Sequence, residues 1–238
     1  MGEHEHLAAR HRKELSGSIF TLLFIFAATY GLDRSFARYL DRLVRSGHFS
    51  RWTAILRYLQ TGMAIFFLAE MVLVIFLYRI GPLRMTLREM GLNFVASKWK
   101  GLLWGFLTGL LVYVASLPLL KFDRHSDLTN LIVNNVFSPR IILVAVLFVI
   151  LLPISSEIVF RGIFFKSFVA SATPVAAVLL SGVFFALLWP VYNPLTGFLL
   201  GVTNALLYYR FRNVVVPFVA NATLTIAYAV TLVWKQLY

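Results

Sequence analysis

The sequence has no cysteine and few charged residues. Without cysteine, disulfides, thiolate metal ligands and cysteine nucleophiles are excluded. Charged residues make up 13% of the 238 residues, against about 25% in a typical soluble domain. Hydrophobic residues make up 60%, and the mean hydropathy is +0.80. This composition argues against a soluble protein and predicts a membrane protein with one polytopic domain.

Histidines and acidic residues are also scarce, most of all in the second half of the chain. The five histidines all lie at or before His125, and Glu157 is the only acidic residue after Asp127. Metal sites in proteins are built from several Cys, His, Asp or Glu side chains. Acid–base catalysis by paired carboxylates needs a second acid beside the first. We therefore predict no metal and no cofactor, and we expect no carboxylate pair around Glu157.

The net charge of +12 comes from 22 basic and 10 acidic residues. Many of the arginines lie in short segments between apolar runs, where they suit anionic lipid headgroups better than nucleic acid. Residues 34–45 carry arginines at helical spacing opposite an apolar stripe, which predicts a helix lying in the membrane interface. A cytoplasmic helix packed on other loops is the alternative for this segment. A second amphipathic stretch covers residues 83–94.

Seven apolar segments predict an all-α transmembrane bundle of about seven spans with interfacial amphipathic helices. Several are shorter than the roughly 20 residues that cross a bilayer, so tilted helices are expected. The segments are residues 18–32, 61–78, 101–120, 141–154, 173–189, 195–209 and 214–233.

Residues 1–15 form a predicted polar tail, and residues 16–238 a single integral membrane domain. The expected location is a prokaryotic inner (plasma) membrane with the N-terminus in the cytoplasm. Small residues repeat every four positions in the third and sixth apolar segments, a spacing that lets helices pack closely. They are Gly101, Gly105 and Gly109, and then Gly197, Gly201 and Ala205.

Glu157 and Arg161 are charged residues in an apolar stretch. They lie four residues apart, so they share one face of a helix and are expected to form an ion pair. Charged residues inside a membrane are costly and are functional candidates by default. Pro153 precedes them and can break the helix locally, which frees backbone carbonyls. Glu70 and Asn204, in other apolar segments, are candidates to line a polar cavity.

Three short stretches form a pattern: Ser156-Glu157-Ile-Val-Phe-Arg161-Gly, Phe185-Ala-Leu-Leu-Trp189 and Asn221-Ala-Thr-Leu-Thr225. The pattern resembles the CAAX protease and bacteriocin-processing (CPBP, or Abi) family of intramembrane endopeptidases. That family carries Glu-Glu-xxx-Arg, then Phe-xxx-His, then a His followed four residues later by Asn. The resemblance covers residues 83–233 and implies a helical core with a peptidase site at these positions.

The chain departs from the family at four motif positions. Glu157, Arg161 and Phe185 match. The first glutamate of the family falls on Ser156, the histidine of the second motif on Trp189, and the histidine and asparagine of the third on Asn221 and Thr225. In the family, the first glutamate and the histidines activate and hold the attacking water. In this sequence the residues at those positions are not glutamate or histidine, so the groups that would activate and hold a water are missing.

Our leading hypothesis is a non-catalytic member of this family that acts as a membrane scaffold or binds a partner. The partner is another membrane protein or a peptide or lipidated ligand. The rival is an active endopeptidase with a rearranged site in which Glu157 is the catalytic group. A transporter or channel subunit is a third reading, and an unrelated fold with a chance match is a fourth. A Ser156 nucleophile lacks a nearby base, and Trp189 next to Pro190 fits an interfacial anchor.

Overall fold

The computed structural model describes residues 99–122, 146–188 and 193–237, together with Gly91, residues 41–47 and five single positions between residues 27 and 39. Within these residues all regular structure is helical and no strand occurs. The all-α prediction is therefore confirmed for the described part of the chain. The tail at residues 1–15, the predicted span at 61–78, all but positions 27 and 31 of the span at 18–32, and all but Gly91 of residues 83–94 lie outside it.

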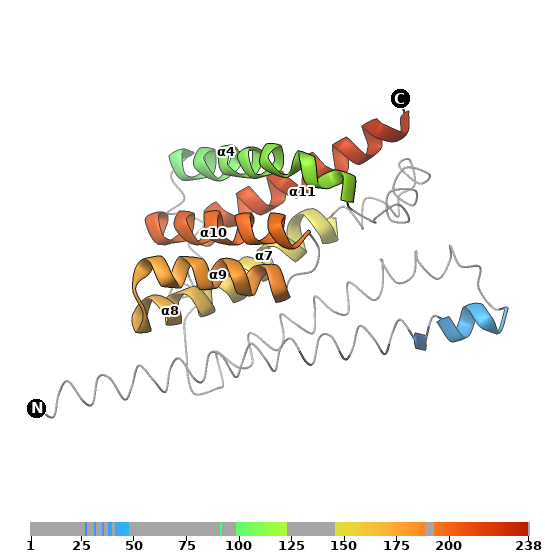
Figure 1. Ribbon diagram of the computed structural model, residues 1–238, viewed down its shortest axis with the longest axis horizontal. Helices are drawn as coiled ribbons and strands as arrows, with labels where there is room; N and C mark the ends of the chain where they lie inside the picture. The colour runs from blue at the N-terminus through green and yellow to red at the C-terminus, as the bar shows by residue number, and fades with distance from the viewer. Residues whose placement is uncertain are drawn as a thin grey trace, which may run out of the picture.

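Six α-helices form the described bundle (Figure 1). The α-helices are α4 (Trp99–Ser116), α7 (Leu152–Glu157), α8 (Lys166–Ser171), α9 (Pro174–Leu188), α10 (Pro194–Phe211) and α11 (Val215–Leu237). Four of them are long: α9, α10 and α11 lie side by side in that order, and α4 packs against α11 and α10. A 3-10 helix, η2 (Leu117–Phe122), extends α4.

The segment from Leu147 to Ser171 is one continuous helix of mixed type. Two π-helical stretches, η3 (Leu147–Leu151) and η4 (Ile158–Phe165), alternate with α7 and α8. Pro153 lies at the start of α7, directly after the first π-helical stretch. The predicted break does not occur: Pro153 lies in the first turn of α7, where a missing backbone N–H is tolerated, and the helix continues to Ser171. Such π-segments are rare in proteins and are frequent at functional sites.

Helices α4 and α11 run parallel and pack through glycines. A Cβ added at Gly101 or Gly105 would meet Val216, and one added at Gly109 would meet the backbone carbonyl of Ala220. At Gly105 and Gly109 the nearest atom is a backbone carbonyl oxygen, so a methyl group does not fit there, whereas at Gly101 it is a side-chain methyl of Val216 at 3.1 Å. The predicted packing role of this glycine series is confirmed.

Helices α9 and α10 are antiparallel and also meet through glycines. The Cβ of a residue at Gly201 would lie 2.8 Å from the Cα of Gly182, and one at Gly197 would lie 3.2 Å from the Cα of Ala186. The close approach of the two helices sets the distance between Ser181 and the carbonyl of Gly201. Both of these groups contact Arg161, as described below.

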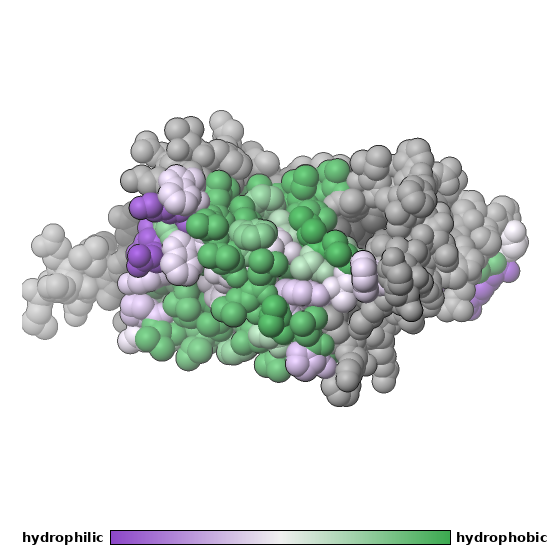
Figure 2. All heavy atoms as spheres, turned by 90° about the horizontal axis from the view of Figure 1, so that it is seen from above, coloured by the Kyte–Doolittle hydropathy of each residue, from purple (hydrophilic) through white to green (hydrophobic). Residues whose placement is uncertain are grey.

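The outer face of α4 is apolar and exposed. Trp99–Leu119 is the one segment among the described residues that is long and apolar enough to cross a membrane, with 21 residues and a mean hydropathy of 1.9. Pro174–Leu187 and Val215–Thr231 are shorter apolar helices. Trp104 is 56% exposed and Leu111 is 66% exposed. Figure 2 shows this face as largely hydrophobic, with hydrophilic atoms gathered at one end.

Two amphipathic segments were predicted before the bundle. In the first, the described positions 38, 39 and 41–45 are helical, and Arg45 pairs with Asp41 at 2.6 Å. In the second, only Gly91 is described. Its carbonyl accepts a hydrogen bond of 3.0 Å from the backbone N–H of Val214, in the turn between α10 and α11. Gly91 is therefore held against this turn.

Candidate functional site

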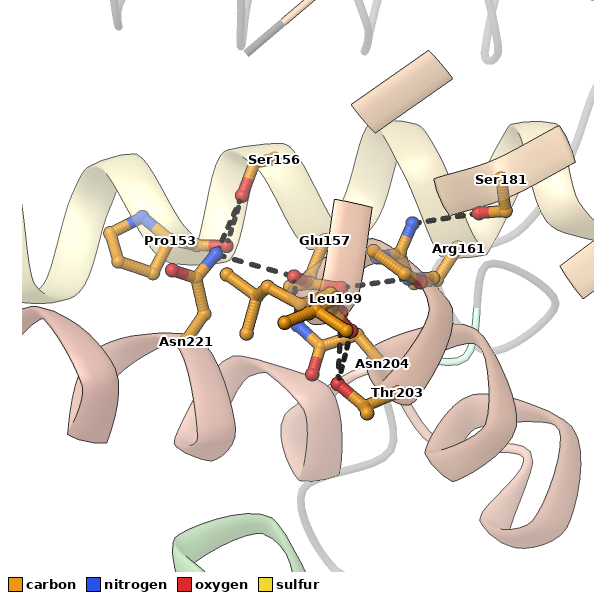
Figure 3. A network of polar contacts seen from close by, with 11 residues as sticks. Pro153, Ser156, Glu157, Arg161, Ser181, Leu199, Thr203, Asn204 and Asn221 are labelled. Atoms are coloured by element: carbon orange, nitrogen blue, oxygen red, sulfur yellow. Dashed lines mark hydrogen bonds and ion pairs between the residues drawn. The ribbon is translucent and has the colours of Figure 1, made fainter. Parts of the chain in front are cut away.

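Glu157 and Arg161 form a buried ion pair inside the bundle. Both side chains are 0% exposed, and Arg161 Nε lies 3.2 Å from Glu157 Oε2 (Figure 3). Glu157 is the last residue of α7 and Arg161 lies in the following π-helical stretch, so the pair lies across a change of helix type. The predicted pairing of these two residues is confirmed.

Arg161 holds two further helices through its remaining nitrogens. Nη1 donates to Ser181 Oγ in α9 at 2.9 Å, and Nη2 donates to the carbonyl of Gly201 in α10 at 3.1 Å. The guanidinium also lies 5.2 Å from the ring centroid of Phe185, within range of a cation–π attraction. The arginine therefore joins three helical segments at one point.

The other oxygen of the Glu157 carboxylate contacts two asparagines. Oε1 accepts from Asn204 Nδ2 in α10 at 2.7 Å and from Asn221 Nδ2 in α11 at 3.3 Å. Hydrogen bonds to an ionised acceptor are stronger than those between neutral groups. The carboxylate is thus enclosed by a cation on one oxygen and two amide donors on the other.

Ser156 lies beside this carboxylate and contacts the same asparagine. Its Oγ accepts from Asn221 Nδ2 at 3.2 Å and donates to the carbonyl of Pro153 at 2.9 Å. The hydroxyl proton is therefore directed at the backbone of its own helix. Ser155 makes a similar bond to the carbonyl of Leu152 at 3.0 Å.

Three buried atoms of this cluster have no hydrogen-bond partner among the described residues: Glu157 Oε2, Arg161 Nε and Asn204 Oδ1. The first two face each other at 3.2 Å outside hydrogen-bonding geometry, so their contact is electrostatic. Asn204 Oδ1 is a buried acceptor without a donor. A buried group left in this state costs about 1–3 kcal/mol.

The remaining predicted positions are placed as follows. Phe185 is fully buried and packs edge-on against Phe160, with ring centroids 4.9 Å apart. Thr225 donates to the carbonyl of Asn221 in its own helix at 2.9 Å. Trp189 and Glu70 lie outside the described residues.

Ser181 and the carbonyl of Gly201 are site groups that the sequence did not single out. Gly201 was predicted only as a packing residue. Ser181 is a hydroxyl in an otherwise apolar helix, one turn before Phe185, and that placement was the available signal. No sequence signal marks the carbonyl of Gly201 as a site group, because every residue has a backbone carbonyl.

We call Ser156, Glu157, Arg161, Ser181, Asn204 and Asn221 the polar cluster. Each of its side chains is at most 1% exposed. The cluster connects the α7–η4 helix with α9, α10 and α11. No group of three His, Cys, Asp or Glu side chains occurs in the part of the chain that the structure describes. Chemically, the arrangement neutralises a buried carboxylate and fixes the helices around it.

Residues 138–227 match a protein-family model described as type II CAAX prenyl endopeptidase Rce1-like. The matched stretch lies inside the range of residues 83–233 over which the motifs were compared, and it includes the whole polar cluster. No curated protein and no solved structure matches the chain.

Proposed function

We propose that this protein is an integral membrane protein that retains, in residues 138–227 matched by the Rce1-like family model, the helical core of the CPBP endopeptidases without their catalysis. It acts as a membrane scaffold or as the subunit that binds a partner. The partner is another membrane protein, or a peptide or lipidated ligand of the kind that the family cleaves.

The observation that carries this proposal is the enclosure of the Glu157 carboxylate. A general base must reach the proton that it removes, directly or through one water. Here Oε1 accepts from two asparagine amides, and Oε2 faces the guanidinium of Arg161. Burial is complete, and this supports a structural role for the carboxylate.

The substitutions at the motif positions support the same conclusion. Ser156 and Asn221 occupy the places of a glutamate and a histidine, and they hydrogen-bond to each other at 3.2 Å. Neither side chain takes up a proton near neutral pH. The two residues replace a pair of proton-handling groups with a neutral interhelical contact.

The proposal includes the membrane topology predicted from the sequence. Seven spans and a cytoplasmic N-terminus in a prokaryotic inner membrane are consistent with the apolar exposed face of α4. Anionic lipid headgroups are the expected contacts of the basic loops.

The rival function is an active intramembrane endopeptidase centred on Glu157. One observation favours it: the first and third motif positions converge, since Asn221 Nδ2 lies within 3.3 Å of both Ser156 Oγ and Glu157 Oε1. The backbone geometry of a peptidase site is therefore compatible with this bundle.

The deciding experiment is a cleavage assay on the purified protein in lipid nanodiscs, with a prenylated peptide that ends in a CAAX sequence. We expect no product from the wild type and none from Glu157→Gln. A known CAAX endopeptidase in the same nanodiscs serves as the positive control. Product that disappears in Glu157→Gln would establish the rival function and end the proposal.

A gain-of-function variant adds a second discriminating measurement. The triple substitution Ser156→Glu, Trp189→His and Asn221→His restores the family residues at three motif positions. If the wild type is inactive because these groups are missing, the wild type should show no cleavage and the triple variant should show measurable cleavage. If the wild type is a weak enzyme, the same change should increase an activity that is already measurable.

A further inference from the structure

The described bundle has a basic end at which three helix termini meet. Lys100 lies in the first turn of α4, and Arg210 and Arg212 lie at the C-terminus of α10. Gly101 and Phe211 hold these residues together, since a Cβ at Gly101 would lie 3.5 Å from the Phe211 ring. We call Lys100, Arg210 and Arg212 the basic cluster.

The basic cluster is exposed, and no acidic residue in the described part of the chain pairs with it. All three side chains are exposed. The only acidic residues among the described positions are Asp41, which pairs with Arg45, and Glu157, which pairs with Arg161. Within the described part of the chain, the three charges of the cluster are therefore uncompensated.

Aromatic rings surround these charges. Arg212 lies over the ring of Tyr209 at 4.9 Å, and Lys100 lies over Trp99 at 5.9 Å. Tryptophan and tyrosine beside basic residues are typical of the headgroup level of a bilayer. The backbone of Arg212 adopts a left-handed conformation with φ 51°, which ends α10 and turns the chain into α11.

The apolar face of α4 begins at the basic cluster. Leu103, Trp104 and Leu107 are exposed within the next two turns after Lys100. Hydrophilic atoms in Figure 2 lie at one end of the hydrophobic face, in agreement with this sequence of residues. A partner that fits both surfaces has a negative group joined directly to a long apolar part.

We propose that the basic cluster binds the phosphate of an anionic phospholipid, whose acyl chains lie along the exposed face of α4. A soluble acidic protein would satisfy the charges but would leave the adjoining apolar face uncovered. The positive-inside rule assigns this end to the cytoplasmic leaflet. The inference holds whether or not the protein is an enzyme, because no residue of the polar cluster takes part.

The first test is lipid binding to the purified protein by native mass spectrometry, with phosphatidylglycerol compared with phosphatidylcholine. The wild type should retain phosphatidylglycerol preferentially. The double variant Arg210→Gln and Arg212→Gln should bind it about thirtyfold more weakly, because each basic residue near a lipid surface contributes about fivefold to the affinity.

The matched control is the double variant Lys121→Gln and Lys235→Gln. It removes the same charge from the opposite end of the bundle, where η2 and the last turn of α11 lie. It should bind phosphatidylglycerol as the wild type does. Equal weakening in both double variants, or equal binding of the two lipids by the wild type, would overturn the proposal.

The second test asks which leaflet the basic cluster faces. Because the chain has no cysteine, one introduced cysteine is the only thiol that a maleimide can label. Thr173→Cys, at the end of the bundle that holds the cluster, should react with a membrane-impermeant maleimide in inside-out vesicles. Leu195→Cys, at the opposite end, should react in right-side-out vesicles. The reverse pattern would place the cluster in the outer leaflet and refute the assignment.

Discussion

At the scale of single residues, Arg161 is the side chain on which most of the cluster depends. It contacts Glu157 within its own helix, Ser181 in α9 and the backbone of Gly201 in α10. A buried charge is tolerated only when its partners are complete, and removing one partner from a buried pair costs about 3–5 kcal/mol. The contacts of Arg161 therefore fix the relative positions of three helices.

Substitution of Ser181 by alanine should destabilise the protein more than the same substitution at Ser155. Ser181 accepts from a charged donor, a bond that contributes about 1.5–3 kcal/mol, whereas Ser155 only donates to the carbonyl of Leu152. Ser155→Ala should be nearly neutral. Thermal unfolding in detergent, followed by circular dichroism, measures both. Equal shifts in melting temperature would show that the arginine does not depend on Ser181.

The ion pair could be predicted from the sequence, and most of its surroundings could not. Glu157 and Arg161 lie on one helix, so their spacing alone brings them together. The contacts with Asn204, Asn221 and Ser181 depend on how three other helices pack against this one. Local sequence patterns do not determine the angles and positions at which helices cross. Ser156 and Asn221 were placed near each other only through the family motif.

At the scale of elements, glycines and π-helical turns decide which groups meet. The helix from Leu147 to Ser171 includes two π-helical stretches and continues through Pro153. The glycines of α4 allow the backbones of α4 and α11 to come into close contact. Helix association in a membrane relies on such close packing because lipid supplies no hydrophobic driving force between helices.

Gly109→Ala should destabilise the α4–α11 contact, whereas Gly101→Ala should have little effect. At Gly109 the new methyl group would collide with the carbonyl of Ala220 and lie 2.8 Å from Thr223 Cβ. Neither can rotate away, and overpacking of this kind costs about 1–3 kcal/mol.

At Gly101 the nearest atom is a methyl of Val216 at 3.1 Å, which belongs to a side chain that can adjust. The higher helix propensity of alanine offsets the crowding there by about 1 kcal/mol. Thermal unfolding of both variants in the same detergent provides the comparison. A greater loss at Gly101 than at Gly109 would contradict the parallel register of α4 and α11.

The glycine spacing predicted that α4 and α10 pack closely, and the structure identifies their partners. The mixed helix type of Leu147–Ser171 was missed, because a π-turn has no residue signature comparable to the glycine of a tight turn. Pro153 suggested a break, but the helix continues through it. Sequence patterns thus located the helices better than they described their geometry.

At the scale of the whole molecule, the described bundle has an apolar exposed face on α4 and a buried polar cluster within its apolar core. Apart from Lys100, the exposed side chains of α4 are mostly Leu, Trp, Phe and Val, whereas the ion pair and its Ser and Asn partners are buried among apolar side chains. A soluble protein shows the opposite distribution. This arrangement agrees with the composition, and it indicates which face of the described bundle meets lipid.

Tryptophan fluorescence should detect that face directly. In a variant that keeps Trp104 and replaces the other four tryptophans with phenylalanine, lipids with brominated acyl chains should quench emission more than aqueous acrylamide does. A variant that keeps only Trp99, beside Lys100, should respond more to acrylamide. Preferential quenching of Trp104 by acrylamide would mean that the outer face of α4 meets water.

The location of both charges on one helix also bears on how the protein is made. Glu157 and Arg161 are four residues apart and are synthesised within moments of each other, before Ser181, Asn204 and Asn221 exist. During insertion, the two charges neutralise each other inside a single helix, which lowers the cost of passing that helix into lipid. The later helices then supply the remaining partners one at a time. The ion pair is therefore complete first, and it gives the helices that follow a fixed point around which to assemble.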